Sequence, residues 1–314
     1  MEYRKLISFG KSSFVVSIPK PWINKQNLKK GDVLYFEETE ENLILSAKEK
    51  ETDEEKKTTI NIDGKTISQI QREITPAYIK NFKRITIIGK EIKDKAKDIE
   101  PIIQNMIALE IMEQTSSRIV AKDFLNMKDI SINNLIRKMD VITRSMIEDS
   151  SNMFKEDSYE NINHRDKDVN RLSYLVFRVV NYCLEKPSFS IKQFNLNNHE
   201  LVKYYLLAYH IEAIADEARR IARYMKKVNL SKTKEKQFVD LFNQAKSNYL
   251  DTMKAFHNKD VNLGLQVAER KRKLMLDYEK FYLENHTVQW TAYLIDRLKR
   301  MTGSIHKLGR LVYE

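Results

Sequence analysis

The sequence predicts a mainly α-helical protein with a small β domain at its N-terminus. Hydrophobic residues make up 42% of the 314 positions and charged residues 32%, with only seven glycines and five prolines, a composition that favours long helices. Two short runs of β-forming residues around a glycine turn open the chain, and apolar residues at helical spacing dominate from residue 132 onward. We therefore expect a small β unit, a small α/β segment and then two three-helix bundles.

The first 47 residues are predicted to form two β-hairpins with a short helix between them. A turn at residues 10–13 separates the first two strands, and the prolines at 19 and 21 are tolerated in the first turn of a helix. A unit of this size buries too little apolar surface to be stable alone, so we expect it to form a homodimer. The predicted elements are the strands Tyr3–Phe9, Phe14–Ile18, Val33–Glu37 and Leu43–Ser46, and a helix from Pro19 that stops near Leu28.

This N-terminal segment is cationic. Up to Lys30 it contains a single acid, Glu2, whereas acids are frequent from Asp32 to Glu49. Basic side chains that contact phosphates supply most of the non-specific affinity for DNA and make binding salt-dependent. The alternative for any one lysine is a simple solvated surface, but the group as a whole favours DNA. The basic residues are Arg4, Lys5, Lys11, Lys20, Lys25, Lys29 and Lys30.

Two motifs in this segment stand at the spacing of a known family: the S-x-x-V-S-I-P-K-x-W run from Ser13 to Trp22 and the L-x-K-G-D turn from Leu28 to Asp32. The segment therefore resembles the AbrB/SpoVT/MazE family of swapped-hairpin DNA-binding domains. The resemblance covers residues 1–47 and implies that two chains interleave their hairpins while basic loop residues face double-stranded DNA. Carried over to this chain, the DNA-facing residues are Arg4, Lys5, Lys11, Ser12, Ser13 and Lys20.

Residues 48–58 are charged, without an apolar residue, and are predicted to be a linker, with a solvated Glu/Lys helix as the alternative. Residues 59–130 then alternate in type, which predicts a small α/β segment that acts as a spacer or dimerisation module. Its lone glycines do not form a phosphate-binding loop. The predicted strands are Thr59–Ile62, Arg84–Ile88 and Arg118–Ala121, and the predicted helices are Thr66–Phe82 and Ile92–Met112.

Residues 131–228 and 229–314 are predicted to form two three-helix units. Apolar residues recur every three or four positions, as in helices that pack against one another. Asp149 precedes Phe154 by the interval at which Asp251 precedes Phe256, so the second unit repeats the architecture of the first. The predicted seams include Leu135, Met139, Ile142 and Met146; Val169, Leu172, Val176, Val179 and Cys183; and Leu207, Ile211, Ile214, Ala218, Ile221 and Met225.

Glu212 and Asp216 stand four residues apart in the third helix, on one face that the helical period directs away from the apolar seam. The E-x-I-x-D-x-A-x-x-I-A run that contains them, with Arg165-Asp166-x-x-Val169 on the preceding helix, resembles the PhoU family of phosphate-uptake regulators over residues 132–314. In that family such faces bind surface clusters of divalent or ferric metal ions. The positions that correspond to the metal ligands here are Glu212, Asp216 and, in the second unit, Asp296.

Three positions depart from the PhoU pattern. Arg300 stands where the second unit has its second acid, Arg220 where asparagine is usual, and Asn170 where an aspartate commonly closes the second-helix motif. A guanidinium four residues after Asp216 can neutralise this carboxylate without a metal. An Asp216–Arg220 ion pair on a solvated face is therefore the alternative to a metal site.

The order of the segments resembles a class of archaeal regulators that join an AbrB-like domain to PhoU-like repeats. This resemblance covers nearly the whole chain and implies phosphate-responsive control of transcription. A different interpretation is a PhoU-like adaptor that regulates a phosphate ABC transporter, through its ATPase, or a kinase by protein–protein contact, with the N-terminal domain serving mainly for dimerisation. The sequence specifies neither the operator nor the effector.

Composition limits the remaining function classes. The net charge of +11 favours acidic partners, and the lone Cys183 permits no intramolecular disulfide. The chain lacks an apolar run of about 18 residues and a signal-peptide h-region, which predicts a cytoplasmic protein without membrane insertion. The six histidines are scattered, so neither a histidine metal site nor a catalytic set can be assigned, and we do not expect an enzyme. His210 and Cys183 are predicted to be structural residues, and Trp22 and Trp290 packing anchors.

Overall fold

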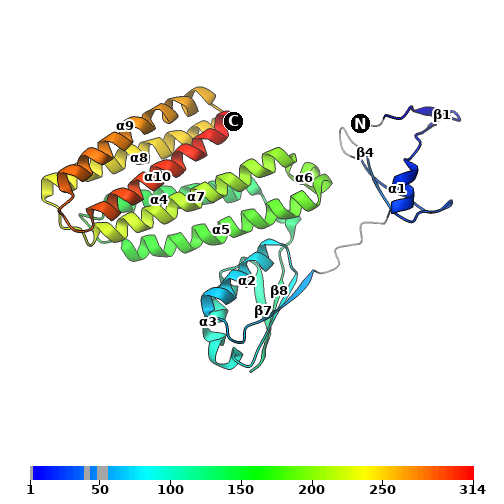
Figure 1. Cartoon of the computed structure of the whole chain (residues 1–314), viewed down its shortest axis with the longest axis horizontal. Helices are drawn as coiled ribbons and strands as arrows, with labels where there is room; N and C mark the ends of the chain where they lie inside the picture. The colour runs from blue at the N-terminus through cyan, green and yellow to red at the C-terminus, as the bar shows by residue number, and fades with distance from the viewer. Residues whose placement is uncertain (1–2, 39–42, 48–55) are drawn as a thin grey trace. The chain divides into compact units, whose positions relative to one another are not determined.

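The computed structural model describes residues 3–38, 43–47 and 56–314 (Figure 1). Its contacts divide the chain into two compact units, Met1–Glu54 and Glu55–Glu314, which we describe separately. Most of the predicted linker, residues 48–55, lies outside the described residues. Within the described part, no helix is long and apolar enough to span a bilayer.

The N-terminal unit contains two antiparallel hairpins and one short helix. The first hairpin pairs Ile7 with Val15 and Phe9 with Ser13, and Gly10 supplies the left-handed conformation of the turn with φ 73°. None of the side chains described for this unit is buried, so it has no core of its own. The elements are β1 (Ile7–Phe9), β2 (Ser13–Val15), α1 (Lys20–Lys25), β3 (Tyr35–Glu38) and β4 (Leu43–Ser46), with β1 and β2 shorter than predicted.

The α/β segment consists of a four-stranded sheet in the order β5-β6-β8-β7 with two helices on one face (Figure 1). β5 and β6 are parallel and the other neighbours antiparallel. Isoleucines from β5, β6 and β8 form a core with isoleucines from both helices. The elements are β5 (Lys57–Asn61), α2 (Ile67–Ile79), β6 (Arg84–Ile88), α3 (Ile92–Gln104), β7 (Leu109–Gln114) and β8 (Arg118–Asp123).

The predicted helix Ile92–Met112 was wrong beyond residue 104. α3 ends at Gln104, Ala108 takes a left-handed conformation with φ 63°, and Leu109 begins the edge strand β7. Within β7, Leu109 is buried while Glu110 and Met112 are exposed, which is the two-residue period of a strand. A short apolar run satisfies either period, so pairing with β8 decided this segment.

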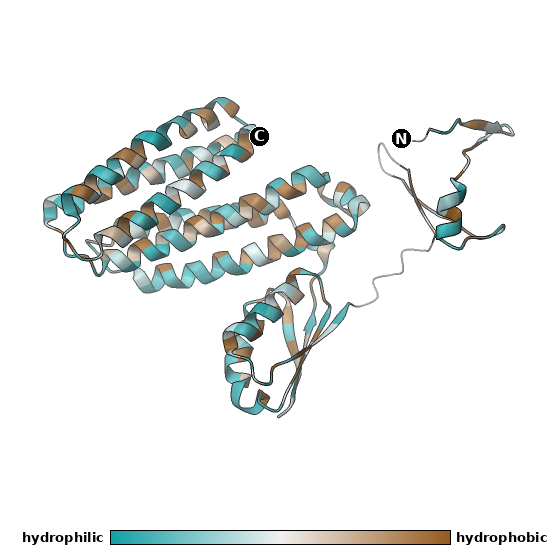
Figure 2. Ribbon diagram, in the orientation of Figure 1, coloured by the Kyte–Doolittle hydropathy of each residue, from teal (hydrophilic) through white to brown (hydrophobic). Residues whose placement is uncertain are grey.

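Seven helices follow, and six of them form two three-helix units around one continuous core. The first unit consists of α4, α5 and α7, and the second of α8, α9 and α10. Figure 2 shows apolar and polar residues alternating along these helices, as expected where one side of each helix is buried. Their bounds are α4 (Ile132–Ser151), α5 (Tyr159–Glu185), α6 (Pro187–Phe194), α7 (Asn198–Met225), α8 (Lys232–Asn258), α9 (Val261–Asn285) and α10 (Thr291–Tyr313).

The two three-helix units repeat one interhelical contact. Arg165 of α5 pairs with Asp149 of α4, and Arg270 of α9 pairs with Asp251 of α8 at 2.6 Å. The third helices, α7 and α10, pack against each other in antiparallel orientation, since Glu217 contacts Arg297 and Tyr224 stacks on Tyr293. The short helix α6, in what was predicted to be a connection, begins at Pro187 and is followed by left-handed Asn195.

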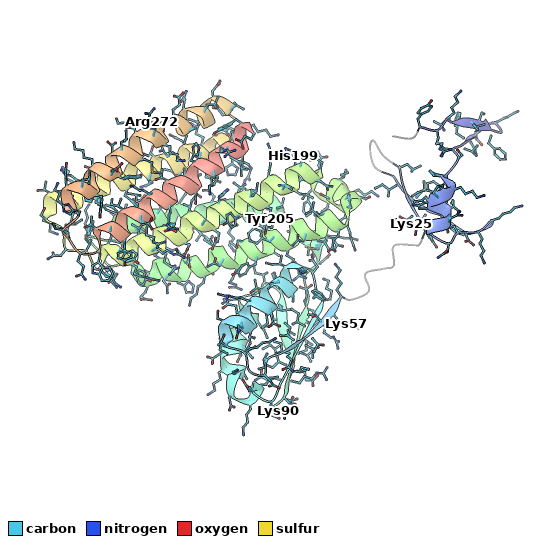
Figure 3. All side chains as sticks on the ribbon, in the orientation of Figure 1. Lys25, Lys57, Lys90, His199, Tyr205 and Arg272 are labelled. Atoms are coloured by element: carbon cyan, nitrogen blue, oxygen red, sulfur yellow. The ribbon has the colours of Figure 1, made fainter. Side chains whose placement is uncertain are left out.

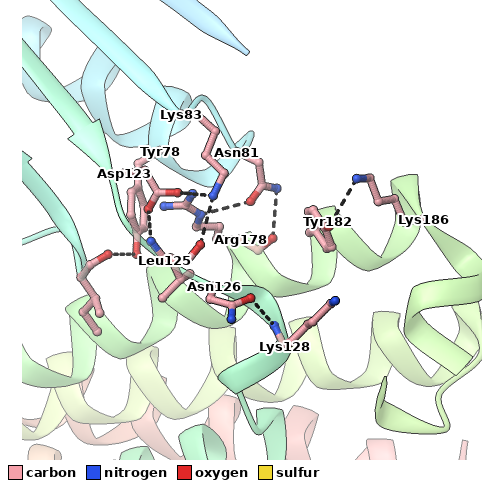
Figure 4. Close-up of polar contacts among 11 residues, drawn as sticks. Tyr78, Asn81, Lys83, Asp123, Leu125, Asn126, Lys128, Arg178, Tyr182 and Lys186 are labelled. Carbon is pink, nitrogen blue, oxygen red and sulfur yellow. Dashed lines mark hydrogen bonds and ion pairs between the residues drawn. The ribbon is translucent and has the colours of Figure 1, made fainter. Parts of the chain in front are cut away.

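A buried polar cluster joins the α/β segment to the helices (Figure 4). The guanidinium of Arg178, fully buried on α5, donates from Nη2 to Asp123 at 2.5 Å and from Nε to the Asn81 side chain at 3.1 Å, and it stacks over the Tyr78 ring. Lys83 Nζ lies 2.6 Å from the same Asp123 carboxylate. We call Tyr78, Asn81, Lys83, Asp123 and Arg178 the Arg178 cluster. Through it the sheet and the bundle form one unit.

Candidate nucleic-acid interface and acidic helical face

The residues predicted to face DNA are all exposed in the N-terminal unit. Lys11 and Ser12 form the turn of the first hairpin, and Ser13 begins β2, so the hairpin register brings these three together. Arg4 and Lys5 lie before β1, away from that turn along the strand. Lys20 is the first residue of α1, whose start is fixed by Pro19 as N-cap and Pro21 in the first turn.

The same unit exposes much of its apolar surface. Phe9 and Phe14 of the first hairpin are 70% and 69% exposed, and Ile7 is 58% exposed. An open apolar pocket of about 320 Å³ lies between the β2–α1 segment and β4. Trp22, only half-buried, lines this pocket with Val16, Ile18 and Leu45, so the packing of Trp22 is incomplete within this unit. The unpaired edges of the two-stranded sheets, together with exposed phenylalanine rings, indicate a surface that another molecule covers.

The acidic face of α7 belongs to a continuous series of ion pairs. Arg219 contacts Asp166 of α5 at 3.0 Å and Asp216 at 2.5 Å, and Arg220 contacts Asp216 at 2.6 Å. Glu217 then bridges Arg220 and Arg297 of α10, at 3.5 Å in each case. We call this series the ion-pair chain; its members in order of contact are Asp166, Arg219, Asp216, Arg220, Glu217, Arg297, Asp296 and Arg300.

Glu212 lies beside the ion-pair chain and is mostly withdrawn from water. Burial, and then repulsion from Asp216 and Asp166, raises the pKa of Glu212 to about 7. Burial also raises the pKa of Asp166, although the nearby Arg219 opposes this shift, and burial raises the pKa of Glu217. Glu212 and Asp216 thus lie in a partly buried setting rather than on the fully solvated face that the helical period predicted.

The three predicted metal ligands do not fit a metal cluster in this structure. Asp216 is held by two guanidiniums, and Asp296 is paired with Arg300 at 2.9 Å. Among the described residues, no group of three or more histidine, cysteine, aspartate or glutamate side chains is arranged to hold a metal ion. The Asp216–Arg220 ion pair, considered from the sequence as the alternative, is present.

A pH dependence of stability follows from Glu212. Because folding raises its pKa from 4.5 to about 7, the native state holds a proton that the unfolded state releases between these values. Its contribution to stability is therefore full below about pH 4.5 and is lost as the pH rises through about 7. We expect the unfolding free energy to fall by about 1–2 kcal/mol more from pH 5 to pH 8 in the wild type than in Glu212→Gln, allowing for partial solvent screening.

Urea unfolding followed by circular dichroism at several pH values checks this expectation. The exposed Glu279→Gln on α9 is the matched control and should leave the pH profile unchanged. Part of the slope should persist in Glu212→Gln because Asp166 and Glu217 shift in the same direction. Identical profiles for wild type and Glu212→Gln would contradict the assignment.

Several members of the ion-pair chain were missed from the sequence. Arg219 and Glu217 lie within one turn of Asp216, so helical spacing alone could have indicated them. Asp166 was noted only as part of the motif on the preceding helix, and Arg297 was not noted. Both come from other helices, and no local pattern shows that they pair with residues of α7. His210 and Cys183 are both buried on their helices, the setting predicted for them from the sequence.

Comparison with known families gives two matches. Residues 7–53 match the family model described as antidote-toxin recognition MazE, bacterial antitoxin. Residues 136–225 match the PhoU domain, a range that runs from α4 to the end of α7. A search of curated proteins gives no significant match. The chain therefore carries a MazE-like segment followed by a PhoU-like segment, as predicted, and the PhoU match covers the first three-helix unit.

Proposed function

We propose that this protein is a cytoplasmic DNA-binding transcription regulator of phosphate uptake, active as a homodimer through its N-terminal unit. The observation that carries the proposal is the combination, in the MazE-like segment, of exposed cations with an apolar surface that this unit does not itself bury. The PhoU-like segment relates the helical part to phosphate homeostasis. In this proposal, the helical units sense phosphate status or bind a partner that reports it.

The dimer explains the missing core of the N-terminal unit. Burial of apolar surface contributes roughly 25 cal/mol per Å², and this unit leaves Ile7, Phe9 and Val15, which share one face of the first hairpin, in water. A second copy that covers these side chains and the pocket beside Trp22 would supply the missing burial. Pairing at the free edges of the two-stranded sheets would also satisfy their backbone groups.

DNA is the partner that best suits the polar part of this unit. Two copies double the number of exposed basic residues, and lysine, arginine and serine side chains are common contacts to phosphate oxygens. Lys20 also stands in the first turn of α1, beside backbone N–H groups. Figure 3 labels Lys25, the last residue of the same short helix, and its side chain is exposed as well.

The test measures the salt dependence of DNA binding. Each lysine that contacts a phosphate contributes close to one unit to the slope of log affinity against log salt concentration. We expect Lys11→Ala plus Lys20→Ala to weaken binding of a promoter fragment about 10- to 100-fold and to reduce the slope by about two units per protomer.

The matched control changes two exposed lysines of the helical part, Lys232 and Lys236, to alanine. This variant should bind the fragment with wild-type affinity and slope. Fluorescence anisotropy between 50 mM and 300 mM salt gives both quantities. Equal slopes for the wild type and the Lys11/Lys20 variant would show that these two lysines do not contact the DNA phosphates.

A second candidate is the adaptor, which would bind a transporter ATPase or a kinase through the helices. It is favoured by an exposed apolar stripe on α7, where Val202, Leu206 and Tyr209 stand on one face. Tyr205, labelled on α7 in Figure 3, packs on Phe177 of α5 beside this stripe. Binding that lacks sequence preference at physiological salt, together with co-purification of the ATPase, would favour the adaptor over the regulator.

A further inference from the structure

We propose that arginine side chains occupy the role of metal ions on the acidic face of this protein, so that the ion-pair chain joins the two three-helix units without any metal. The guanidiniums of Arg219 and Arg220 are the fixed cations of this face. Metal would then have no part in stabilising or signalling through the bundle, in contrast with what the resemblance of α7 implies.

The charges of the ion-pair chain balance internally. Acids and arginines alternate from Asp166 to Arg300, so that four carboxylates face four guanidiniums. Each carboxylate between the two ends contacts two arginines. A divalent or ferric ion entering this series would approach at least one guanidinium closely and would be repelled.

The contacts tie together helices from both three-helix units. The Arg219–Asp166 pair joins α7 to α5 within the first unit, and the Glu217–Arg297 pair joins α7 to α10 of the second. Both pairs lie at the packed seam, where the side chains of Asp166 and Glu217 are each 10% exposed. Ion pairs shielded from water in this way are weakened less by salt than surface pairs.

The outer end of the ion-pair chain differs in its setting. Asp296 and Arg300 lie four residues apart on α10 and are 46% and 61% exposed. In the second unit they stand where α7 of the first unit has Glu212 and Asp216. An arginine therefore replaces one member of the acidic pair in α10, while in α7 both acids remain and arginines from the next helical turn neutralise Asp216.

The experiment uses the full chain, with Mn²⁺ and Fe³⁺ as probes. Protein purified without chelator is analysed for metal by mass spectrometry, and its melting temperature is measured in EDTA, in Mn²⁺ and in Fe³⁺. We expect less than about 0.1 metal ion per chain and a melting temperature that is the same within error in all three conditions, because the described residues hold no set of donors arranged to bind a metal ion. Metal bound near stoichiometrically, or a melting temperature that falls in EDTA, would overturn the proposal.

Two variants test the role of the arginines directly. Arg219→Gln plus Arg220→Asn leaves Asp166 and Asp216 without the guanidiniums that pair with them. With Glu212 beside them, this variant should bind Mn²⁺ at least 10-fold more tightly than the wild type, and Mn²⁺ should raise its melting temperature. The matched control is Lys226→Gln plus Lys227→Asn, which also removes two positive charges, just beyond the end of α7. This variant should gain no affinity for Mn²⁺.

The milder Arg220→Asn leaves Arg219 in place and serves if the double variant does not fold. It should show a smaller gain in Mn²⁺ affinity than the double variant. Without metal, its melting temperature should lie between those of the wild type and the double variant. Arginine variants that keep the wild-type Mn²⁺ affinity would show that the guanidiniums do not exclude metal and would refute the proposal.

Discussion

Asp123→Asn is expected to destabilise the Glu55–Glu314 unit by about 3–5 kcal/mol, because it leaves the fully buried Arg178 without a counter-charge. Asp123 accepts hydrogen bonds from both Arg178 and Lys83, at 2.5 and 2.6 Å, so one substitution removes the partner of two cations. Lys83 can reach water, since a quarter of its side chain is exposed, but Arg178 cannot. The cost therefore arises mainly at Arg178.

Two further variants separate this explanation from a general sensitivity of the fold. Arg178→Met removes the buried cation and leaves Asp123 paired with Lys83, so its effect should be smaller than that of Asp123→Asn. Asp157→Asn breaks an exposed pair with Lys226 at 2.8 Å and should cost far less stability than Asp123→Asn, because water screens this pair. Urea unfolding followed by far-ultraviolet circular dichroism gives all three values. Equal losses for Asp123→Asn and Asp157→Asn would refute the role of the cluster.

Ile7→Asp is expected to abolish dimerisation of the protein and, with it, DNA binding. Ile7 is directly opposite Val15 in the first hairpin, and both are exposed in a single chain. Burial of such a side chain contributes about 1.5–3 kcal/mol, and a carboxylate in its place adds a desolvation cost. We therefore expect the dimer dissociation constant to rise at least about 100-fold, as measured by analytical ultracentrifugation.

Ser8→Asp is the matched control for that experiment. Ser8 pairs with Phe14 in the same hairpin, and successive strand residues point to opposite faces, so this carboxylate lies on the other face from Ile7. A homodimer that buries the Ile7 face should tolerate Ser8→Asp better by a factor of about 10 or more in dissociation constant. Equal dimerisation of Ile7→Asp and wild type would disprove this assignment of the interface.

Local pattern was enough to identify most elements. The long helices from Ile132 onward follow from apolar residues three and four positions apart, and the first hairpin follows from short β-forming runs around Gly10. Boundaries were less certain, since the predicted strand Tyr3–Phe9 is only Ile7–Phe9 in the structure. On α4 the predicted buried face differs slightly from the observed one. Leu135 and Ile142, predicted to be in the core, are half-buried, whereas Ile132 and Ile136 are buried.

Elements whose identity depends on a neighbour could not be predicted in this way. β7 becomes a strand because β8 offers it a partner, and a run from Ile92 to Met112 satisfied the helical period equally well. The predicted metal site failed for the same reason, because it also depends on groups from neighbouring helices. Glu212 and Asp216 have the spacing of a paired ligand set, and spacing also indicated Arg220 as a partner of Asp216. Spacing does not show that Arg219 also pairs with Asp166 of α5 or that Glu217 pairs with Arg297 of α10.

By itself the sequence determined a basic, MazE-like N-terminal segment, a PhoU-like helical segment and the faces of the helices, because these depend on residues a few positions apart. Only the tertiary structure decided that Asp123 neutralises Arg178, that Arg219 reaches Asp166, and that α7 and α10 share ion pairs. The physical reason is that a charge is satisfied by whatever group folding brings within about 3 Å, and these partners are separated by tens of residues along the chain.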